Sequence, residues 1–246
     1  MLFDSEDLIS LSEKERSRIR GERISAVLQN PSLSLNPVYS VGRQVAEVFR
    51  VHRGTPRRKA EQQAAELLSR MGIEDAARRM NLYPFQFSEG MNQRVLIATG
   101  VALDPRILIA DEPTKGLDVE LKREIIAELK LIQEGGRTAF FLIAHDLEAA
   151  AQLCERIAVM YAGEIVEEAL TKEFFTSPYH PYSQGLLDSM PDKGFQPVPG
   201  SSPSLIRPPS GCPFHPRCPK VMDICSQEKP LLIPYQGRKV RCHLYS

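Results

Sequence analysis

Two adjacent carboxylates follow an apolar run in the middle of the chain. Asp111 and Glu112 come directly after residues 106–110 (RILIA) and before Pro113. A continuous apolar run bounded by turns is typical of a buried strand. At the carboxyl end of a parallel strand, one carboxylate can hold Mg²⁺ while the next polarises an attacking water. An isolated pair of this kind more often caps a turn, so the functional interpretation needs a second feature.

That second feature is a histidine at the end of another apolar run. Residues 138–144 (TAFFLIA) are followed by His145 and Asp146. A histidine there can donate a hydrogen bond to a phosphate oxygen. A lone histidine at a strand end is usually structural, but two strand ends with complementary chemistry favour a phosphate site.

A third candidate is the start of a predicted helix over residues 90–103. Ser88 is suited to cap this helix, and Gly90 leaves space beside its first turn. Free backbone N–H groups and the positive end of the helix dipole attract anions. Any helix can begin with serine, so this feature is weak evidence by itself.

The elements that would position these residues follow an α/β pattern. Runs at 106–110, 138–144 and 157–162 predict strands of a parallel sheet that is covered on both faces, and the run at 25–29 predicts a short strand. Amphipathic stretches predict helices over 57–71 and 119–132, the latter with Asp118 as its N-cap. After Gly163, residues 164–167 are expected to form an exposed hairpin arm.

Composition excludes several classes of protein. The 246 residues include 42% hydrophobic and 25% charged residues, which indicates a globular chain. Lys+Arg and Asp+Glu number 31 each, so no overall positive charge attracts nucleic acid. No apolar stretch reaches the ~20 residues of a membrane-spanning helix, and the acidic start does not resemble a secretory signal. The pattern predicts a cytosolic protein.

Four of the five cysteines lie near the C-terminus, where they suggest a metal site. In a reducing compartment, clustered cysteines are more often metal ligands than disulfides. Four thiolates can complete a Zn²⁺ site or hold a [4Fe–4S] cluster, whereas unligated thiols are the least favoured interpretation. His215 and His243 could replace one ligand, and Cys154 is expected to be a small buried side chain. The four candidate ligands are Cys212, Cys218, Cys225 and Cys242.

Three segments, in their order and spacing, resemble the ATP-binding subunits of ABC transporters. They are QNPSLSLNP from Gln29, residues 87–118 (FSEGMNQRVLIATGVALDPRILIADEPTKGLD), and FLIAHD, which ends at Asp146. EDLISLSEKERSRIRG, VMYAGEIVE, HPYSQGLL, GCPFHPRCP and RCHL further resemble the oligopeptide, dipeptide and nickel import branch. The resemblance covers essentially the whole chain. It implies a P-loop NTPase-like ABC nucleotide-binding domain with a helical subdomain and a small Cys-rich C-terminal extension.

The resemblance also implies roles in the hydrolysis of ATP. Gln29 matches the Q-loop glutamine and His145 the switch histidine, and both would sense the γ-phosphate. Asp111 and Glu112 end the Walker B strand, where Asp111 would organise Mg²⁺ and Glu112 would polarise the attacking water. Positioning and charge neutralisation would supply the rate.

Further residues match the parts of the family that act between subunits. Ser88 and Gly90 match the signature motif, which reaches a nucleotide held by the opposite subunit, and Asp118 ends the D-loop. The resemblance therefore implies a second ABC ATPase subunit, in a homo- or heterodimer. It also implies transmembrane permease subunits docked around Gln29 and the helices up to Tyr83, a solute-binding protein that acts indirectly, and a peripheral place on the cytoplasmic side of the membrane. For the cysteine tail it favours an iron–sulfur cluster.

The chain departs from the family in two places. The phosphate-binding loop GxxxxGK[ST] does not occur, and no Gly-Lys dipeptide is present. Because Met1 aligns with family sequence that follows this loop, we expect a truncated start and a chain that binds and hydrolyses ATP poorly by itself. Glu89 replaces a usual glycine of the signature motif. A carboxylate within ~4 Å of a phosphate charge costs about 4 kcal/mol at an effective dielectric near 20.

These features predict an organisation and two functions. Residues 1–175 would form the ATPase domain, with its helical subdomain over about 40–100, followed by a Pro-rich linker (176–211) and the Cys-rich extension (212–246). The chain would be the ATP-binding and ATP-hydrolysing subunit of an importer of oligopeptides, dipeptides or nickel. The alternative is a non-catalytic remnant or regulatory partner of an intact ATPase. No nucleic acid is expected as a partner.

Overall fold

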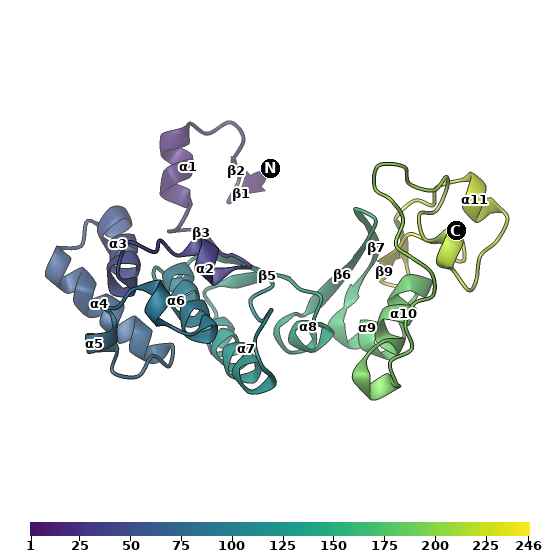
Figure 1. Cartoon of the computed structure of the whole chain (residues 1–246). Helices are drawn as coiled ribbons and strands as arrows, with labels where there is room; N and C mark the ends of the chain where they lie inside the picture. Colours follow the sequence, from purple (N-terminus) through teal and green to yellow (C-terminus); the bar gives the residue numbers. More distant parts are fainter. The chain divides into compact units, whose positions relative to one another are not determined.

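The chain folds as two compact units, residues 1–153 and residues 154–246, in the computed structural model shown in Figure 1. The structure describes residues 1–246, apart from the side chain at position 192. Within the described residues, no helix is long and apolar enough to cross a membrane.

Unit 1 alternates helices with the strands of a parallel sheet. A short N-terminal hairpin and a capped helix precede the sheet, and five α-helices and a 3-10 turn lie between its first two strands. In chain order the elements are β1 (Leu2–Phe3), β2 (Glu6–Asp7), α1 (Glu13–Ile19), β3 (Ile24–Val27), α2 (Pro31–Ser34), α3 (Val41–Arg53), α4 (Arg57–Arg70), α5 (Ala76–Arg79), the 3-10 turn η1 (Pro84–Gln86), α6 (Glu89–Val101), β4 (Ile107–Asp111), α7 (Val119–Glu134), β5 (Ala139–Ile143) and α8 (Leu147–Leu153).

The sheet of unit 1 has three parallel strands in the order β3-β4-β5. Ala26 pairs with Ile109, which pairs with Phe141 on the other side. The helices α6 and α7 provide the crossovers that parallel pairing requires. The predicted strands that precede the carboxylates and the histidine are confirmed. Their carboxyl ends meet at one edge of the sheet, as expected.

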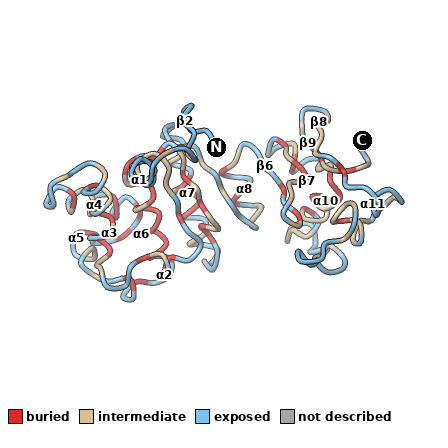
Figure 2. Tube along the Cα trace, turned by 90° about the horizontal axis from the view of Figure 1, so that it is seen from above, coloured by how far each residue is buried: buried red, intermediate tan, exposed pale blue. Residues whose placement is uncertain are grey.

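Helix α6 forms the centre of the core of unit 1. Figure 2 shows it as a mostly buried segment, and residues on every side of the helix are buried. A Cβ at Gly100 would lie 2.9 Å from Cγ2 of Val27, so glycine allows the helix to approach the sheet closely. Val27, Leu108 and Ala110 make up the sheet face beneath it and are fully buried. Because α6 is packed in this way, the position of Ser88, its N-cap residue, is fixed relative to the sheet.

The opposite face of the sheet is not covered, which corrects the expectation of burial on both faces. Alternate residues of β5 point away from α6, and among them Phe141 is 60% exposed and Ile143 45% exposed. The apolar run of β5 is therefore continuous although alternate residues of the strand are exposed.

Unit 2 contains an antiparallel sheet in the order β6-β7-β9-β8. Its strands come from both ends of the unit, with short helices and loops between them. In chain order the elements are β6 (Arg156–Tyr161), β7 (Glu164–Leu170), α9 (Thr171–Thr176), α10 (Pro181–Asp188), the 3-10 turns η2 (Pro191–Lys193) and η3 (His215–Arg217), α11 (Ile224–Gln227), β8 (Ile233–Tyr235) and β9 (Arg238–Val240).

Two predictions about this sheet are wrong. The run at 157–162 belongs to β6, which pairs antiparallel with β7 rather than joining the parallel sheet. The reason is the two-residue turn of Ala162 (φ 49°) and Gly163 (φ 83°), which reverses the chain directly and leaves no room for a crossover. The hairpin expected after Gly163 is present, but its second arm is not exposed: it is β7, an inner strand of the sheet, where Glu167 is fully buried.

The predicted linker begins with regular structure. Helix α10 occupies part of it and buries Leu187 and Ser183. Beyond η2, residues 194–211 contain no helix or strand. The domain boundaries expected from the sequence stay predictions.

Candidate functional site

The carboxylate of Glu112 is the centre of the candidate site. It follows the last residue of β4, in a left-handed conformation (φ 47°) that non-glycine residues rarely adopt. Its backbone N–H donates to the carbonyl of Ile143 over 2.7 Å, which extends the ladder between β4 and β5 by one residue. Backbone strain of this kind costs about 1–3 kcal/mol and is concentrated at functional sites.

Three side chains from separate segments meet on this carboxylate. Gln29, just beyond β3, donates its Nε2–H to Oε2 of Glu112. Nδ1 of His145, beyond β5, lies 3.2 Å from Oε1. Nζ of Lys115 lies 2.8 Å from Oε2. The ends of three neighbouring strands thus bring these four residues together, because parallel strands end at a common edge.

The electrostatics of this cluster favour an ionised carboxylate. The hydrogen bond from Lys115 lowers the pKa of Glu112 to about 2, with smaller contributions from His145 and Gln29. Burial acts in the opposite direction but is outweighed. Glu112 therefore carries a negative charge at neutral pH and can accept hydrogen bonds from any donor that enters the site.

Lys115 is a member of the cluster that sequence reasoning missed. It stands three residues after Glu112, and its backbone N–H donates to the carbonyl of Glu112 over 3.1 Å in a turn. The signal was present in the sequence, because a tight turn after a strand end returns the third residue toward the first. Asp111, by contrast, ends β4 half-buried, as expected for a residue beside the edge of the sheet.

The predicted signature residues lie at the start of α6. The hydroxyl of Ser88 accepts a hydrogen bond from the backbone N–H of Met91 over 3.3 Å, so the predicted N-cap is confirmed. A Cβ at Gly90 would lie 2.0 Å from Cδ2 of Leu121, so α6 packs against the first turn of α7 there. Asp118 caps α7 by accepting from the N–H of Leu121 over 2.9 Å.

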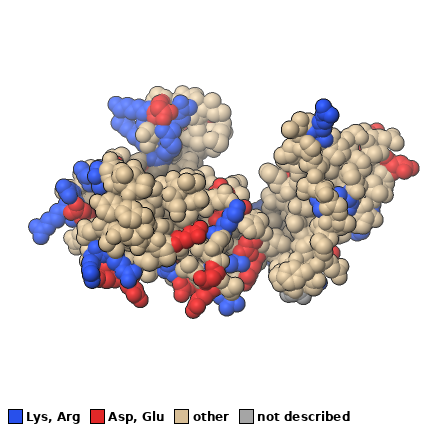
Figure 3. Space-filling model, in the orientation of Figure 1, with Lys and Arg blue, Asp and Glu red and all other residues tan. Residues whose placement is uncertain are grey.

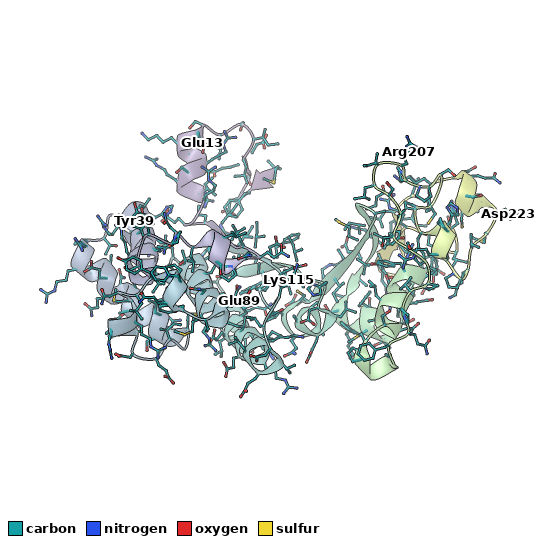
Figure 4. The ribbon with its side chains drawn as sticks, in the orientation of Figure 1. Glu13, Tyr39, Glu89, Lys115, Arg207 and Asp223 are labelled. Atoms are coloured by element: carbon teal, nitrogen blue, oxygen red, sulfur yellow. The ribbon has the colours of Figure 1, made fainter. Side chains whose placement is uncertain are left out.

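Glu89 points toward the turn that contains Gly116. A Cβ placed on Gly116 would lie 3.3 Å from Oε1 of Glu89. Figure 4 labels both Glu89 and Lys115 in this part of unit 1. The signature segment and the residues after β4 are therefore neighbours through Glu89 and Gly116, and the carboxylate of Glu89 is exposed at the first turn of α6.

The four C-terminal cysteines all lie in unit 2. The backbone N–H of Cys212 donates to the carbonyl of Cys225 over 2.8 Å. Burial raises the pKa of the Cys242 thiol to about 11, and the charges of the other three cysteines add to the shift. The backbone N–H of His215 donates to the carbonyl of Cys212 over 3.0 Å. The four thiols therefore lie near enough to influence one another.

A compact site for one metal ion is not formed there. Throughout the part of the chain that the structure describes, no three His, Cys, Asp or Glu side chains are arranged to hold a metal ion. A tetrahedral Zn²⁺ site needs its sulfurs at about 2.3 Å from one ion, hence close together. Cys154, the fifth cysteine, is partly buried, and burial raises the pKa of its thiol, as expected for a structural side chain.

Comparison with known proteins identifies the class. Residues 1–115 match the ABC transporter family model, and residues 166–225 match the model of the oligopeptide/dipeptide transporter C-terminal region. Among solved structures, the chain is similar to the ATP-binding cassette MJ0796, in a dimeric post-hydrolysis state bound to ADP and Pi. The TM-score is 0.61 and the sequence identity 31%, over 69% of this chain and 72% of that one.

Curated relatives match nearly the whole of this chain. The chain is 40% identical to the oligopeptide transport ATP-binding protein OppD of Salmonella typhimurium, over 98% of this chain and 73% of the relative. It is 41% identical to the dipeptide transport ATP-binding protein DppD of Escherichia coli, over 98% and 76%. A third relative, AppD of Bacillus subtilis, is 41% identical over 99% and 76%. The chain belongs to the ATP-binding proteins of ABC transporters and carries the C-terminal region of the oligopeptide/dipeptide type.

Proposed function

We propose that the chain is the ATP-binding subunit that energises import of oligopeptides or dipeptides by an ABC transporter. The observation that carries the proposal is the convergence of Gln29 and His145 on the carboxylate of Glu112. The peptide class is supported by the C-terminal family match and by the names of the relatives. Import of nickel is less well supported, because these relatives are named for oligopeptide or dipeptide transport. The alternative of a non-catalytic remnant is not favoured.

The site residues have separate proposed roles in the reaction. Asp111 would hold Mg²⁺, a hard cation that prefers carboxylate oxygens, and Mg²⁺ would neutralise charge on the phosphates. Glu112 would accept a hydrogen bond from the attacking water and so orient it, while Gln29 and His145 would contact the γ-phosphate. The lowered pKa of Glu112 suits an acceptor that remains ionised and orients water, rather than one that takes up a proton early.

ATP binding by these 246 residues alone is proposed to be weak. They contain no GxxxxGK[ST] segment, whose backbone N–H groups and lysine contribute much of the phosphate binding in this fold. We therefore expect the site described above to bind the terminal phosphate and Mg²⁺ more strongly than the rest of the nucleotide.

A second ATPase subunit is the proposed partner at the start of α6. Ser88, Gly90 and the D-loop residue Asp118 lie on two helices that contact each other. The free N–H groups at the start of α6 suit a phosphate of a nucleotide held by that second subunit. The dimeric state of the similar cassette MJ0796 supports this arrangement.

Membrane partners are proposed from the same family. Transmembrane permease subunits would place the chain at the cytoplasmic side of the membrane, and a solute-binding protein would act through them. Leu33, at 85% exposed, and Val38, at 71%, offer apolar contacts beyond Gln29 for such a permease. On the face shown in Figure 3, both basic and acidic side chains occur over unit 1. No nucleic acid is proposed as a partner, because Lys+Arg and Asp+Glu number 31 each.

An iron–sulfur cluster is the proposed occupant of the cysteine region. Four cysteine thiolates are a usual ligand set of such a cluster, and the other three cysteines lie near enough to Cys242 to raise its pKa. Anaerobic purification should yield a brown protein with iron and sulfide, and Cys212→Ser should lose both, whereas Cys154→Ser should keep them. Zinc without iron, or neither metal, would contradict this assignment.

The transport role is tested in cells from which the gene has been deleted. Uptake of labelled tri- and tetrapeptides should be lost in the deletion strain and restored by the intact gene. Restoration should fail with Glu112→Gln and succeed with Glu120→Gln, an exposed carboxylate at the start of α7 that serves as the matched control. Normal peptide uptake in the deletion strain, with loss of nickel uptake, would contradict the peptide assignment.

A further inference from the structure

Lys115 has no role in the function described above, yet it belongs to the same cluster. It lies in the turn that follows β4, and its side chain is 51% exposed. Its Nζ contacts the same oxygen of Glu112 that accepts from Gln29. The side chain does not hold the turn, because the turn is closed by the backbone hydrogen bond between Lys115 and Glu112.

The three groups on Glu112 share one property. Gln29 donates a hydrogen bond, Lys115 donates through a charged group, and His145 donates as the Nδ1–H tautomer. Donors from three separate segments are thus aimed at one small region, where the carboxylate is the anion that receives them. A terminal phosphate entering this region offers three oxygens and more negative charge than a carboxylate. Each donor would then gain a stronger acceptor.

A neighbouring lysine shows what a purely structural ion pair looks like here. Lys122, on α7, is bound to Asp146 and Glu148, two carboxylates beside α8, and its side chain is only 23% exposed. Lys115 differs because it shares its acceptor with the two proposed phosphate sensors and keeps half of its surface open to an incoming ligand.

We infer that Lys115 is a binding residue for the terminal phosphate of ATP. The inference rests on the proposed function, since it assumes that ATP enters this site. In the absence of nucleotide the ammonium group pairs with Glu112. When the phosphate is present, the ammonium group moves to its oxygens and leaves Glu112 free to orient the attacking water. The lysine binds as a charge and takes part in no covalent step.

The inference is tested by the preference for ATP over ADP, because only ATP carries the terminal phosphate. Dissociation constants of MgATP and MgADP would be measured on the full chain by saturation-transfer NMR, up to millimolar nucleotide. Loss of one charge-assisted contact in Lys115→Met should lower the ATP preference about tenfold and leave ADP binding unchanged. Lys115→Arg should retain most of the preference, and Lys122→Met should retain all of it.

The outcomes separate this inference from the proposed function. If the wild-type chain prefers ATP and Lys115→Met keeps that preference, the role of Lys115 is overturned and the ATP site stands. Tighter ATP binding by Lys115→Met would also overturn the role of Lys115, because the lysine would then hinder ATP binding through its ion pair with Glu112. A wild-type chain that binds neither nucleotide would overturn both the inference and ATP binding by this site.

Discussion

Glu128 is a buried carboxyl group whose titration should control the stability of unit 1. It lies on α7, and its side chain is 15% exposed. Arg94 of α6 bonds to Glu128, to Glu124 and to the carbonyl of Met71, but Oε2 of Glu128 is buried without a hydrogen-bond partner. Burial raises the pKa of Glu128 from 4.5 to about 7, and this outweighs the attraction of Arg94.

The raised pKa determines both the sign and the size of the effect. Since the folded-state pKa lies above the unfolded value, the folded protein binds the proton more tightly between pH 4.5 and about 7. The free energy of unfolding of unit 1 should therefore fall as the pH rises through this window. The difference between the two pKa values corresponds to about 3 kcal/mol. The loss should be complete above pH 7.

The perturbation is Glu128→Gln, which keeps the shape of the side chain and removes the titration. Urea unfolding at intervals from pH 4.5 to 8 would be followed by hydrogen–deuterium pulse labelling of peptides from α6 and α7, so that unit 2 does not contribute. The variant should match the wild type near pH 5 and exceed its stability near pH 8 by up to about 3 kcal/mol. Glu134→Gln, an exposed residue at the end of the same helix, is the control.

Two outcomes would contradict a raised pKa of Glu128. If the difference in stability between Glu128→Gln and the wild type is the same at pH 5 and pH 8, Glu128 does not change its protonation over this range. If the wild type is instead stabilised as the pH rises, the ion pair with Arg94 outweighs the cost of burial, and the sign of the shift is wrong.

Three further predictions concern stability. Gly90→Ala should destabilise unit 1 by about 1–3 kcal/mol because its Cβ would overlap Leu121, and adding Leu121→Ala should recover part of the loss in urea unfolding. Burial lowers the pKa of His180 from 6.5 to about 4. The free energy of unfolding of unit 2 should therefore fall by about 3 kcal/mol as the pH falls through that window, and it should fall less in His180→Asn. Gly211→Ala should destabilise unit 2 by at least about 2 kcal/mol, since its φ is 65° and its Cβ would lie 2.3 Å from the carbonyl oxygen of Cys225; unchanged hydrogen exchange in α11 would contradict this.

The two units should therefore respond to pH in opposite ways. Unit 1 becomes less stable as Glu128 ionises, and unit 2 becomes less stable as His180 takes up a proton. Both effects arise from burial, which disfavours the charged form of either group. Neither pKa shift follows from the sequence, because the amino-acid type gives only the ordinary pKa. The shift depends on how far packing removes water from the group.

Much of the candidate site could be predicted from local sequence. The strand that ends at Asp111, the strand that precedes His145 and the cap at Ser88 follow from apolar runs and helix-start signals, and the structure contains all three. Lys115 was missed because the tight turn after the strand end, which is its sequence signal, does not specify where a long side chain points. The run at 157–162 was wrongly assigned to the parallel sheet because a buried antiparallel strand and a buried parallel strand have similar apolar patterns.

The sequence by itself determined the class of protein and the chemical types in its site, because motif spacing and apolar periodicity are properties of neighbouring residues. It determined that carboxylates end one strand and a histidine ends the next. Only the tertiary structure decided that Gln29, Lys115 and His145 converge on one carboxylate, that Glu128 and His180 are buried, and that one face of the parallel sheet stays open. These depend on contacts between residues far apart in the chain, whose geometry is set by packing rather than by local preference.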